Sequence, residues 1–443
     1  MTPTIAELAT QLAEGRTTSE QLVEECVARI ADPDGEGKRA FLFVDADGAR
    51  KTARAMDALR SAQDEPSPYA GIPVSIKDLF DVQGQVTRAG SRVLDGPPAE
   101  RDASAVARWR QAGLVPIGRT NMTEFAFSGL GINSHYGTPA NPWDRPARRI
   151  PGGSSSGGAV SVTDRMAHGA LGTDTGGSCR IPAALCGIVG WKPTQARVPG
   201  DGVVPLSPTL DTVGVLGRSV SCCAILEAIL AGAEPQAVEP LERPPRLAVV
   251  RNYVFDDADD AVAAAFERVS RKLESAGAEL VDLSLPELDW IPDMNAGGGF
   301  AAAESFAWHR DLIEQKPDLY DPLVLPRIRR GERQSARDLI VLRERRAELI
   351  DAVAGRLDGF DAFICPTVPR VAPPLETLED ADSYRATNML MLRNPTVINT
   401  LDGCAISVPM HEQGEPPTGL MVSGLAGEDA AILRTAAWIE RRT

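Results

Sequence analysis

Two segments rich in glycine and serine carry residue types that could support nucleophilic chemistry. Residues 151–158 read PGGSSSGG and open a predicted helix over residues 156–164. A glycine-rich loop at a helix N-terminus favours anion binding, because unpaired backbone N–H groups point outward there. The segment lacks both the Gly-Lys-Ser/Thr ending of a Walker loop and the spacing of a dinucleotide fingerprint. A flexible Gly/Ser connector is the alternative interpretation.

The second segment, residues 171–184, places two glycines directly before Ser178 (LGTDTGGSCRIPAA). Gly176 and Gly177 allow positive φ values, so that successive N–H groups can converge beside the Ser178 hydroxyl. An oxyanion hole requires this arrangement next to a nucleophile. An ordinary Gly-Gly turn followed by an N-cap serine is the alternative.

A lysine could act as the base for such a serine. Lys77 follows the apolar residues 72–76 (IPVSI) and precedes Asp78, and it is one of only six lysines among 46 basic residues. Burial at the end of a strand lowers the pKa of a lysine, as a lysine general base requires. Arginine stays protonated in proteins and cannot replace it. The alternative is a lysine that extends to solvent and pairs with Asp78.

Histidine is the usual partner of a serine nucleophile, but the four histidines of this chain form no compact Ser/His/Asp signature. The chain also lacks a Gly-x-Ser-x-Gly nucleophile elbow. Lys77 is therefore the residue whose neighbourhood best suits a base.

These three segments resemble the amidase signature family in their order along the chain, which is Lys77, then residues 151–158, then residues 171–184. The resemblance covers residues 71–194, including TNMTEF at residues 120–125 and WKPT at residues 191–194. A weaker match lies at residues 399–409 (NTLDGCAISVP). The two serine loops are specific motifs, and Ser154 and Ser178 are 24 residues apart, which is the spacing the family uses.

The resemblance implies a Ser–cis-Ser–Lys triad in which Ser178 is the acyl nucleophile. Ser154, after a cis peptide bond from Gly153, would bridge Ser178 to a neutral Lys77, and the reversed relay would protonate the leaving amine. The resemblance also implies the remaining site residues, which are the oxyanion-hole N–H groups of Thr175, Gly176, Gly177 and Ser178, the acyl-pocket stretch Ala126, Phe127 and Ser128, and a supporting ion pair of Asp174 and Arg180.

The family implies an amidase that hydrolyses a linear carboxylic amide through a serine acyl-enzyme. One alternative is the glutamine-hydrolysing A subunit of a tRNA-dependent amidotransferase, which passes ammonia to a partner. That subunit carries an aspartate seven residues before the asparagine that matches Asn399, whereas this chain has Leu392 there. A non-catalytic binding protein on the same fold is the other alternative, and the three intact triad positions argue against it.

The elements that must position these residues alternate between strands and helices. Predicted strands at residues 72–76 and 115–118 flank a predicted helix at 103–112, and the first 62 residues form helices around a strand at 41–44. Further strands are predicted at residues 247–251, 361–365, 404–409 and 418–423, and further helices at 222–231, 259–276, 296–312, 335–357 and 429–442.

This order predicts an α/β protein whose residues 1–443 form a single large domain, with a central mixed β-sheet flanked by helices as in the amidase signature fold. Its catalytic core would span about residues 71–217. The Pro-rich residues 233–246 are either an interdomain linker or a loop, and strands on both sides favour the loop.

The resemblance also implies that a helical region at about residues 290–357 determines specificity. Its aromatic residues could line a pocket for an apolar acyl group, although at helical spacing they are more often core residues. They are Phe300, Phe306, Trp308 and Tyr320.

The same region contains an arginine-rich run at residues 327–346 that could bind a carboxylate. The arginines recur at helical spacings beside Glu332, Asp338 and Glu344. We therefore expect a solvated face on which these charges form ion pairs.

Composition and charge limit the classes of molecule that the protein could bind. The 443 residues carry a formal net charge of −15, which argues against a nucleic-acid binder. The N-terminus has no basic and apolar signal-peptide regions, and no apolar run approaches the roughly 20 residues of a membrane span. We therefore expect a cytoplasmic protein without a membrane partner.

Seven cysteines form no CxxC pair and no Cys/His cluster, which predicts buried free thiols and no metal site. We expect no cofactor, because the chain supplies both the nucleophile and the base. The expected partner is a small-molecule amide substrate, and a homodimer is the default assembly for a soluble enzyme.

Overall fold

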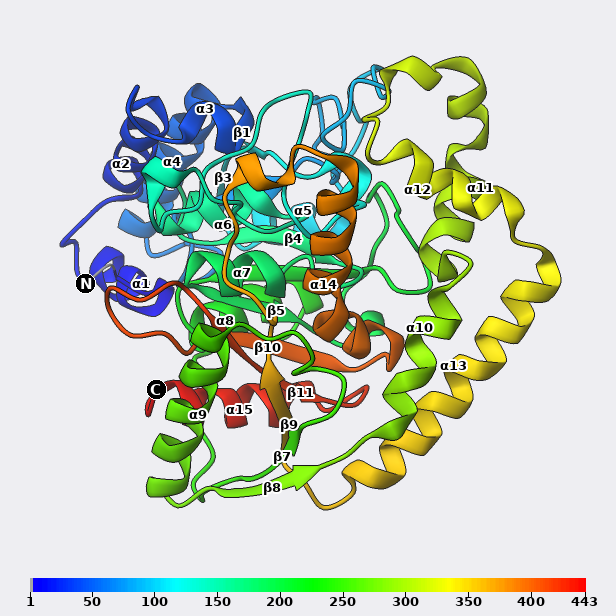
Figure 1. The fold of residues 1–443 in the computed structure, drawn as a ribbon. Helices are drawn as coiled ribbons and strands as arrows, with labels where there is room; N and C mark the ends of the chain where they lie inside the picture. Colours follow the sequence, from blue (N-terminus) through cyan, green and yellow to red (C-terminus); the bar gives the residue numbers. More distant parts are fainter. Residues whose placement is uncertain (1–2) are drawn as a thin grey trace.

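One mixed sheet of eleven strands runs through the molecule, flanked by helices (Figure 1). The computed structural model describes residues 3–443. The strands are β1 (Phe41–Val44), β2 (Pro73–Lys77), β3 (Val115–Thr120), β4 (Ala170–Asp174), β5 (Val189–Lys192), β6 (Thr212–Gly217), β7 (Arg246–Val250), β8 (Glu279–Leu283), β9 (Ala362–Pro366), β10 (Cys404–Pro409) and β11 (Gly419–Gly424).

The strand order across the sheet is β1-β3-β2-β4-β6-β5-β10-β11-β9-β7-β8. Strand β2 pairs in parallel with β3 and β4, and β7 pairs in parallel with β8 and β9. The other pairs are antiparallel. The predicted fold class, a mixed sheet flanked by helices, is confirmed.

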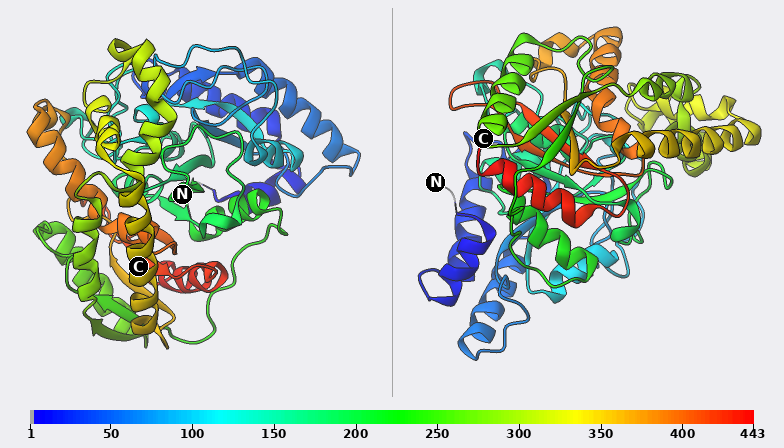
Figure 2. Two further views of the ribbon diagram at one scale, coloured as in Figure 1. Left: turned by 90° about the vertical axis from the view of Figure 1, so that its right-hand side faces the viewer. Right: turned by 90° about the horizontal axis from the view of Figure 1, so that it is seen from below.

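Fifteen α-helices surround the sheet in the described part of the chain. They are α1 (Ile5–Ala13), α2 (Ser19–Ala31), α3 (Gly37–Ala40), α4 (Ala46–Ser61), α5 (Ser104–Gln111), α6 (Ser156–Thr163), α7 (Arg180–Cys186), α8 (Val220–Ala231), α9 (Asp260–Ser275), α10 (Trp290–Asn295), α11 (Gly299–Gln315), α12 (Leu325–Arg329), α13 (Ala336–Leu357), α14 (Ala381–Thr400) and α15 (Asp429–Glu440). Figures 1 and 2 show α10–α13 gathered on one side of the sheet, and α1, α2 and α4 on the opposite side.

Local sequence signals set several of these boundaries. Thr18 begins α2 with a capping box to Gln21, and Ser335 begins α13 with a capping box to Asp338. Strand β2 is buried along its whole length, as its apolar residues predict for a strand in the interior of a sheet.

Helix α14 and strand β8 are among the elements that were not predicted. Helix α14 contains Pro395, which breaks the pattern that a helix normally shows in sequence. In the fold, Pro395 packs against Gly177, where an added Cβ would come within 2.5 Å of the Pro395 Cβ. Strand β8 lies at the sheet edge and is mostly exposed or half-buried, so it lacks a continuous apolar run.

The Pro-rich residues 233–246 connect α8 to β7. The strands before and after this segment belong to the same sheet, so the segment is a loop within one sheet and not a linker between two domains. All seven cysteines lie within the described residues, where they are buried and unpaired. Between residues 3 and 443, no helix has both the length and the apolarity to cross a bilayer.

Candidate active site

Lys77 is the last residue of β2 and is fully buried. Its Nζ donates hydrogen bonds to Ser154 Oγ at 2.7 Å and to Thr173 Oγ1 at 2.9 Å. Burial disfavours the ammonium form and lowers the Lys77 pKa to about 8. The neutral amine is therefore far more accessible near neutral pH than in an exposed lysine.

Ser154 lies in the loop that leads into α6, after a cis peptide bond from Gly153. The Gly153 N–H donates to the Gly129 carbonyl at 2.8 Å, and the Thr123 N–H donates to the Ser154 carbonyl at 3.2 Å. A Cβ on residue 153 would come within 2.5 Å of the Gly131 nitrogen, so glycine is required there. These contacts hold the Ser154 loop against the loop of residues 123–131.

Ser178 lies between β4 and α7 and is 3% exposed. The Ser155 N–H donates to the Ser178 carbonyl at 3.3 Å, which joins the two serine loops. The hydrogen bonds of residues 3–443 do not include one between the hydroxyls of Ser154 and Ser178. The structure thus joins Lys77 to Ser154 through a side-chain hydrogen bond, and it joins the Ser178 loop to the Ser154 loop through the backbone.

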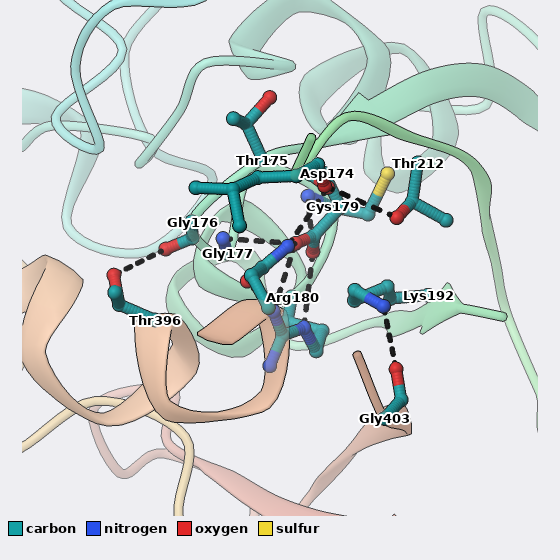
Figure 3. A network of polar contacts seen from close by, with 12 residues as sticks. Asp174, Thr175, Gly176, Gly177, Cys179, Arg180, Lys192, Thr212, Thr396 and Gly403 are labelled. Atoms are coloured by element: carbon teal, nitrogen blue, oxygen red, sulfur yellow. Dashed lines mark hydrogen bonds and ion pairs between the residues drawn. The ribbon is translucent and has the colours of Figure 1, made fainter. Parts of the chain in front are cut away.

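Asp174 and Arg180 form an ion pair with both side chains fully buried (Figure 3). Arg180 Nε and Nη2 donate to the two Asp174 oxygens at 3.0 and 2.8 Å. Burial alone would raise the pKa of Asp174, but the charge and hydrogen bonds of Arg180 hold it well below its usual range. The Asp174 carboxylate also accepts from the Gly177 N–H at 2.9 Å and the Cys179 N–H at 3.2 Å.

The bond from Gly177 to Asp174 corrects the expected oxyanion hole. The Gly177 N–H already has a charged acceptor and is not free for a developing oxyanion. The N–H groups of Thr175, Gly176 and Ser178 remain as candidates. Gly177 nevertheless has φ of +120°, so the turn depends on glycine at this position.

Helix α14 supports this loop from the other side, which sequence reasoning missed. Asn399 Nδ2 donates to the Asp174 carbonyl at 2.9 Å, and Asn399 Oδ1 accepts from Arg180 Nη2 at 2.7 Å. Thr396 Oγ1 reaches the Gly176 carbonyl at 3.5 Å (Figure 3). Asn399 begins the weaker family match at residues 399–409, but no local sequence pattern indicated that it contacts Asp174.

The stretch Ala126, Phe127 and Ser128 is held by contacts from two helices, α14 and α12. Ser128 Oγ donates to Asn388 Oδ1 of α14 at 2.8 Å, and the Gly129 N–H donates to the same oxygen at 2.9 Å. Ala126, like the preceding Phe125, has a positive φ, which persists only where the surroundings enforce it. The Phe127 carbonyl accepts from Arg327 Nη1.

Two of the four aromatic residues expected near the pocket pack beside this stretch. The Phe125 ring lies 6.3 Å from the Trp308 ring and 5.6 Å from the Tyr320 ring, measured between centroids. Phe300 is buried in a core cluster, and Phe306 packs at the edge of another. The helical region thus contributes to both the core and the surroundings of residues 126–128.

The arginine run is largely exposed, as expected, but the expectation that its charges form ion pairs is wrong. Among the arginines of residues 327–346, only Arg346 forms an ion pair within the described chain, at 3.9 Å from Asp402. Asp338 instead caps α13 through the Ser335 hydroxyl and N–H. Other arginines of the run, Arg330, Arg333, Arg337 and Arg345, line an open groove of about 700 Å³.

None of the histidines bonds to either serine. Hydrogen-bond partners of three of them lie elsewhere: Glu124 for His135, Tyr320 for His309 and Thr418 for His411. The ring nitrogens of His168 have no hydrogen-bond partner among residues 3–443. In the same range, no group of three or more His, Cys, Asp or Glu side chains could hold a metal ion.

Comparisons with known proteins find relatives along nearly the whole chain. The family model described as Amidase matches residues 21–433. A 2-amino-5-chloromuconic acid deaminase of Comamonas testosteroni is 37% identical, over 98% of this chain and 95% of its own. The A subunit of a glutamyl-tRNA(Gln) amidotransferase from Acidothermus cellulolyticus is 32% identical, over 99% and 94%. A crystal structure of an amidase has a TM-score of 0.91 at 32% identity and covers 99% of this chain and 100% of its own.

Proposed function

This chain belongs to the amidase family and is an amidohydrolase that acts on C–N bonds, and we propose that it cleaves a small linear carboxylic amide through a serine acyl-enzyme. The observation that carries the proposal is the hydrogen bond from a fully buried lysine of lowered pKa to Ser154, beside the loop that bears Ser178. A lysine in this state can accept a proton, which an ordinary exposed lysine cannot do at neutral pH.

In the proposed mechanism, Lys77 takes a proton from Ser154 while Ser154 takes one from Ser178. The Ser178 oxygen attacks the amide carbonyl, and the N–H groups of Thr175, Gly176 and Ser178 stabilise the oxyanion. The proton then returns through Ser154 to the amide nitrogen, which leaves as a neutral amine. Water releases the acid by the same relay, and the enzyme recovers its neutral lysine.

The buried ion pair positions the nucleophile loop rather than reacting. Asp174 holds two N–H groups of the turn around Ser178, and Arg180 neutralises the carboxylate. Asn399 completes the network from α14. These contacts fix the loop, so that little reorganisation is needed when charge develops on the substrate.

The amidotransferase alternative is less well supported. Leu392 lies where the amidotransferase carries an aspartate, and it packs between Gly129 and Gly176, within 3.1 and 3.5 Å of where their Cβ atoms would be. An apolar side chain there offers nothing to the amino group of glutamine. Copurification of a stoichiometric partner together with glutaminase activity would favour the alternative.

A substrate panel tests the proposal. Aliphatic amides, aryl amides, half-amides of dicarboxylates and urea-type compounds would be compared for release of ammonia or amine, with Ser178→Ala as the matched control. Unsaturated amino acids belong in the panel, because the Comamonas relative is named for deamination of one. Turnover that survives in the Ser178→Ala protein would contradict the proposal.

The pH dependence of kcat/KM follows from the lowered pKa of Lys77. Because the neutral lysine is the base, kcat/KM for an uncharged amide should rise about tenfold per pH unit at low pH and level off above about 8. Stopped assays between pH 5.5 and 9.5 measure this profile. A rate that stays constant across that range would show that no such base titrates.

A further inference from the structure

We infer that a pocket beside the N-terminal helices binds a hydrogen phosphate ion through His168, Arg29 and Arg165, at a site separate from the active site. No step of the proposed mechanism uses these residues. A bound ion would stabilise the fold and leave catalysis unchanged, so its test is independent of the proposed amide hydrolysis.

The pocket has a volume of about 130 Å³ and lies where α1, α2 and the chain before β4 meet. At about 30 Å³ per water molecule, a space of this size holds about four waters, or one ion of four or five heavy atoms. The polar and charged residues that line it are Gln11, Thr17, Glu25, Arg29, Arg165 and His168.

This pocket and the proposed active site lie at opposite ends of the same strands. The His168 N–H donates to the carbonyl of Pro73, the first residue of β2, at 3.0 Å. Lys77 ends β2, and Asp174 ends β4, which begins two residues after His168. Strands β2 and β4 are parallel, so their amino ends lie together and their carboxyl ends lie together. An ion beside His168 is therefore about a strand length away from the catalytic lysine.

The His168 side chain indicates a ligand most directly. His168 is 7% exposed, and neither ring nitrogen has a hydrogen-bond partner among residues 3–443. Burial lowers the pKa of His168 to about 4, so the ring is neutral near neutral pH. A neutral imidazole offers one N–H donor and one nitrogen acceptor. Because buried polar groups normally have partners, the ring calls for a ligand that both accepts and donates.

Positive charge gathers around this ring. The charges of Arg29, Arg165 and Arg218 each contribute to lowering the His168 pKa, so all three lie near it. None of these arginines forms an ion pair within residues 3–443. A pocket lined by one sign of charge raises the local concentration of counter-ions. The ligand should therefore be an anion.

The acidic side chains nearby do not neutralise these arginines. Asp164 precedes Arg165, but its carboxylate pairs with Arg145 at 2.6 Å. Glu25, on the pocket wall, is exposed, so solvent screens its charge. Arg218 donates to carbonyls at the end of α6, which orient its guanidinium without removing its charge.

Hydrogen phosphate meets both requirements of the pocket. Its anionic oxygens can accept from arginine and from the His168 N–H, and its O–H group can donate to the second ring nitrogen. Sulfate and simple carboxylates carry no O–H near neutral pH, so they would leave one ring nitrogen without a partner. Phosphate should therefore bind more tightly than sulfate.

Calorimetric titration of the full chain with inorganic phosphate tests the inference. We expect one saturable site in wild type, with a Kd for sulfate about tenfold higher or more. Arg165→Met and His168→Phe should each raise the phosphate Kd by about 10- to 100-fold. Arg54→Met is the matched control, because Arg54 is an exposed arginine of α4 that pairs with Glu20 and does not line the pocket. It should bind phosphate like wild type.

Two further measurements separate this site from the catalytic one. Protein labelled at Ser178 with a fluorophosphonate should bind phosphate with unchanged affinity. The His168→Phe protein should keep the kcat/KM of wild type, because His168 contacts neither catalytic serine.

Thermal unfolding provides a second readout of binding. At constant ionic strength, phosphate should raise the melting temperature of wild type more than that of His168→Phe, because only a ligand of the folded state stabilises it by mass action. Three results would overturn the inference: no saturable binding to wild type, equal phosphate affinity in wild type and His168→Phe, or loss of binding after Ser178 is labelled.

Discussion

Replacing Lys77 with alanine is expected to lower kcat/KM by about 10²- to 10⁴-fold, the range that general acid–base catalysis contributes. Lys77 Nζ is the nitrogen bonded to Ser154, and burial lowers its pKa to about 8. Without it, neither serine has a base, and the leaving amine has no proton donor. Steady-state kinetics on the best amide of the panel measures the loss.

Replacing Lys77 with arginine should not restore activity, because a guanidinium remains protonated. Lys192 provides a matched control. It is also buried with a pKa lowered by burial to about 8, but within residues 3–443 its side chain donates only to the carbonyls of Pro193 and Gly403. Lys192→Met should lower the melting temperature and retain turnover per folded molecule. Substantial activity in Lys77→Arg would contradict the neutral-lysine mechanism.

Replacing Asp174 with alanine is expected to lower the free energy of unfolding by about 3–5 kcal/mol. The change leaves the Arg180 charge buried without its partner and removes the acceptor of the Gly177 and Cys179 N–H groups. Urea unfolding at neutral pH measures the loss. Glu314→Ala, which breaks an exposed pair with Arg310, is the matched control and should cost about 0–1 kcal/mol.

The double change Asp174→Ala with Arg180→Met should recover part of the stability, because no charge then remains unpaired. The folded-state pKa of Asp174 is lowered, so its contribution is fully present above its unfolded pKa of about 3.9 and is lost as the pH falls below it. Wild type should therefore lose stability more steeply in acid than the double variant. If Asp174→Ala lowered the free energy of unfolding by no more than Glu314→Ala does, the result would contradict this account.

Most of the fold could be predicted where the chain has strong local patterns. The apolar run at residues 72–76 and the helical periodicity at residues 222–231 correspond to β2 and α8, each within two residues. Both patterns reflect burial, which sequence periodicity records directly. The glycine-rich loops were likewise recognisable, because positions such as Gly153 and Gly177 exclude any side chain.

Contacts between distant segments could not be predicted. Ser128 and Asn388 are 260 residues apart, and Asp174 and Asn399 are 225 apart, so no local pattern connects them. Helix α14 carries both asparagines, and Pro395 inside it hides its helical pattern in the sequence. The ion pairs predicted for residues 327–346 were wrong for a similar reason. Helical spacing indicates which charges are neighbours, but it does not indicate that Asp338 caps α13.

Mapping the covalent label of a fluorophosphonate tests the central claim most directly. The account predicts a single adduct on Ser178, absent in Ser178→Ala and formed far more slowly in Lys77→Ala. Ser155, which lies in the neighbouring loop, should remain unlabelled. A folded wild-type protein that carries no adduct on Ser178, or carries it on another serine, would contradict the claim.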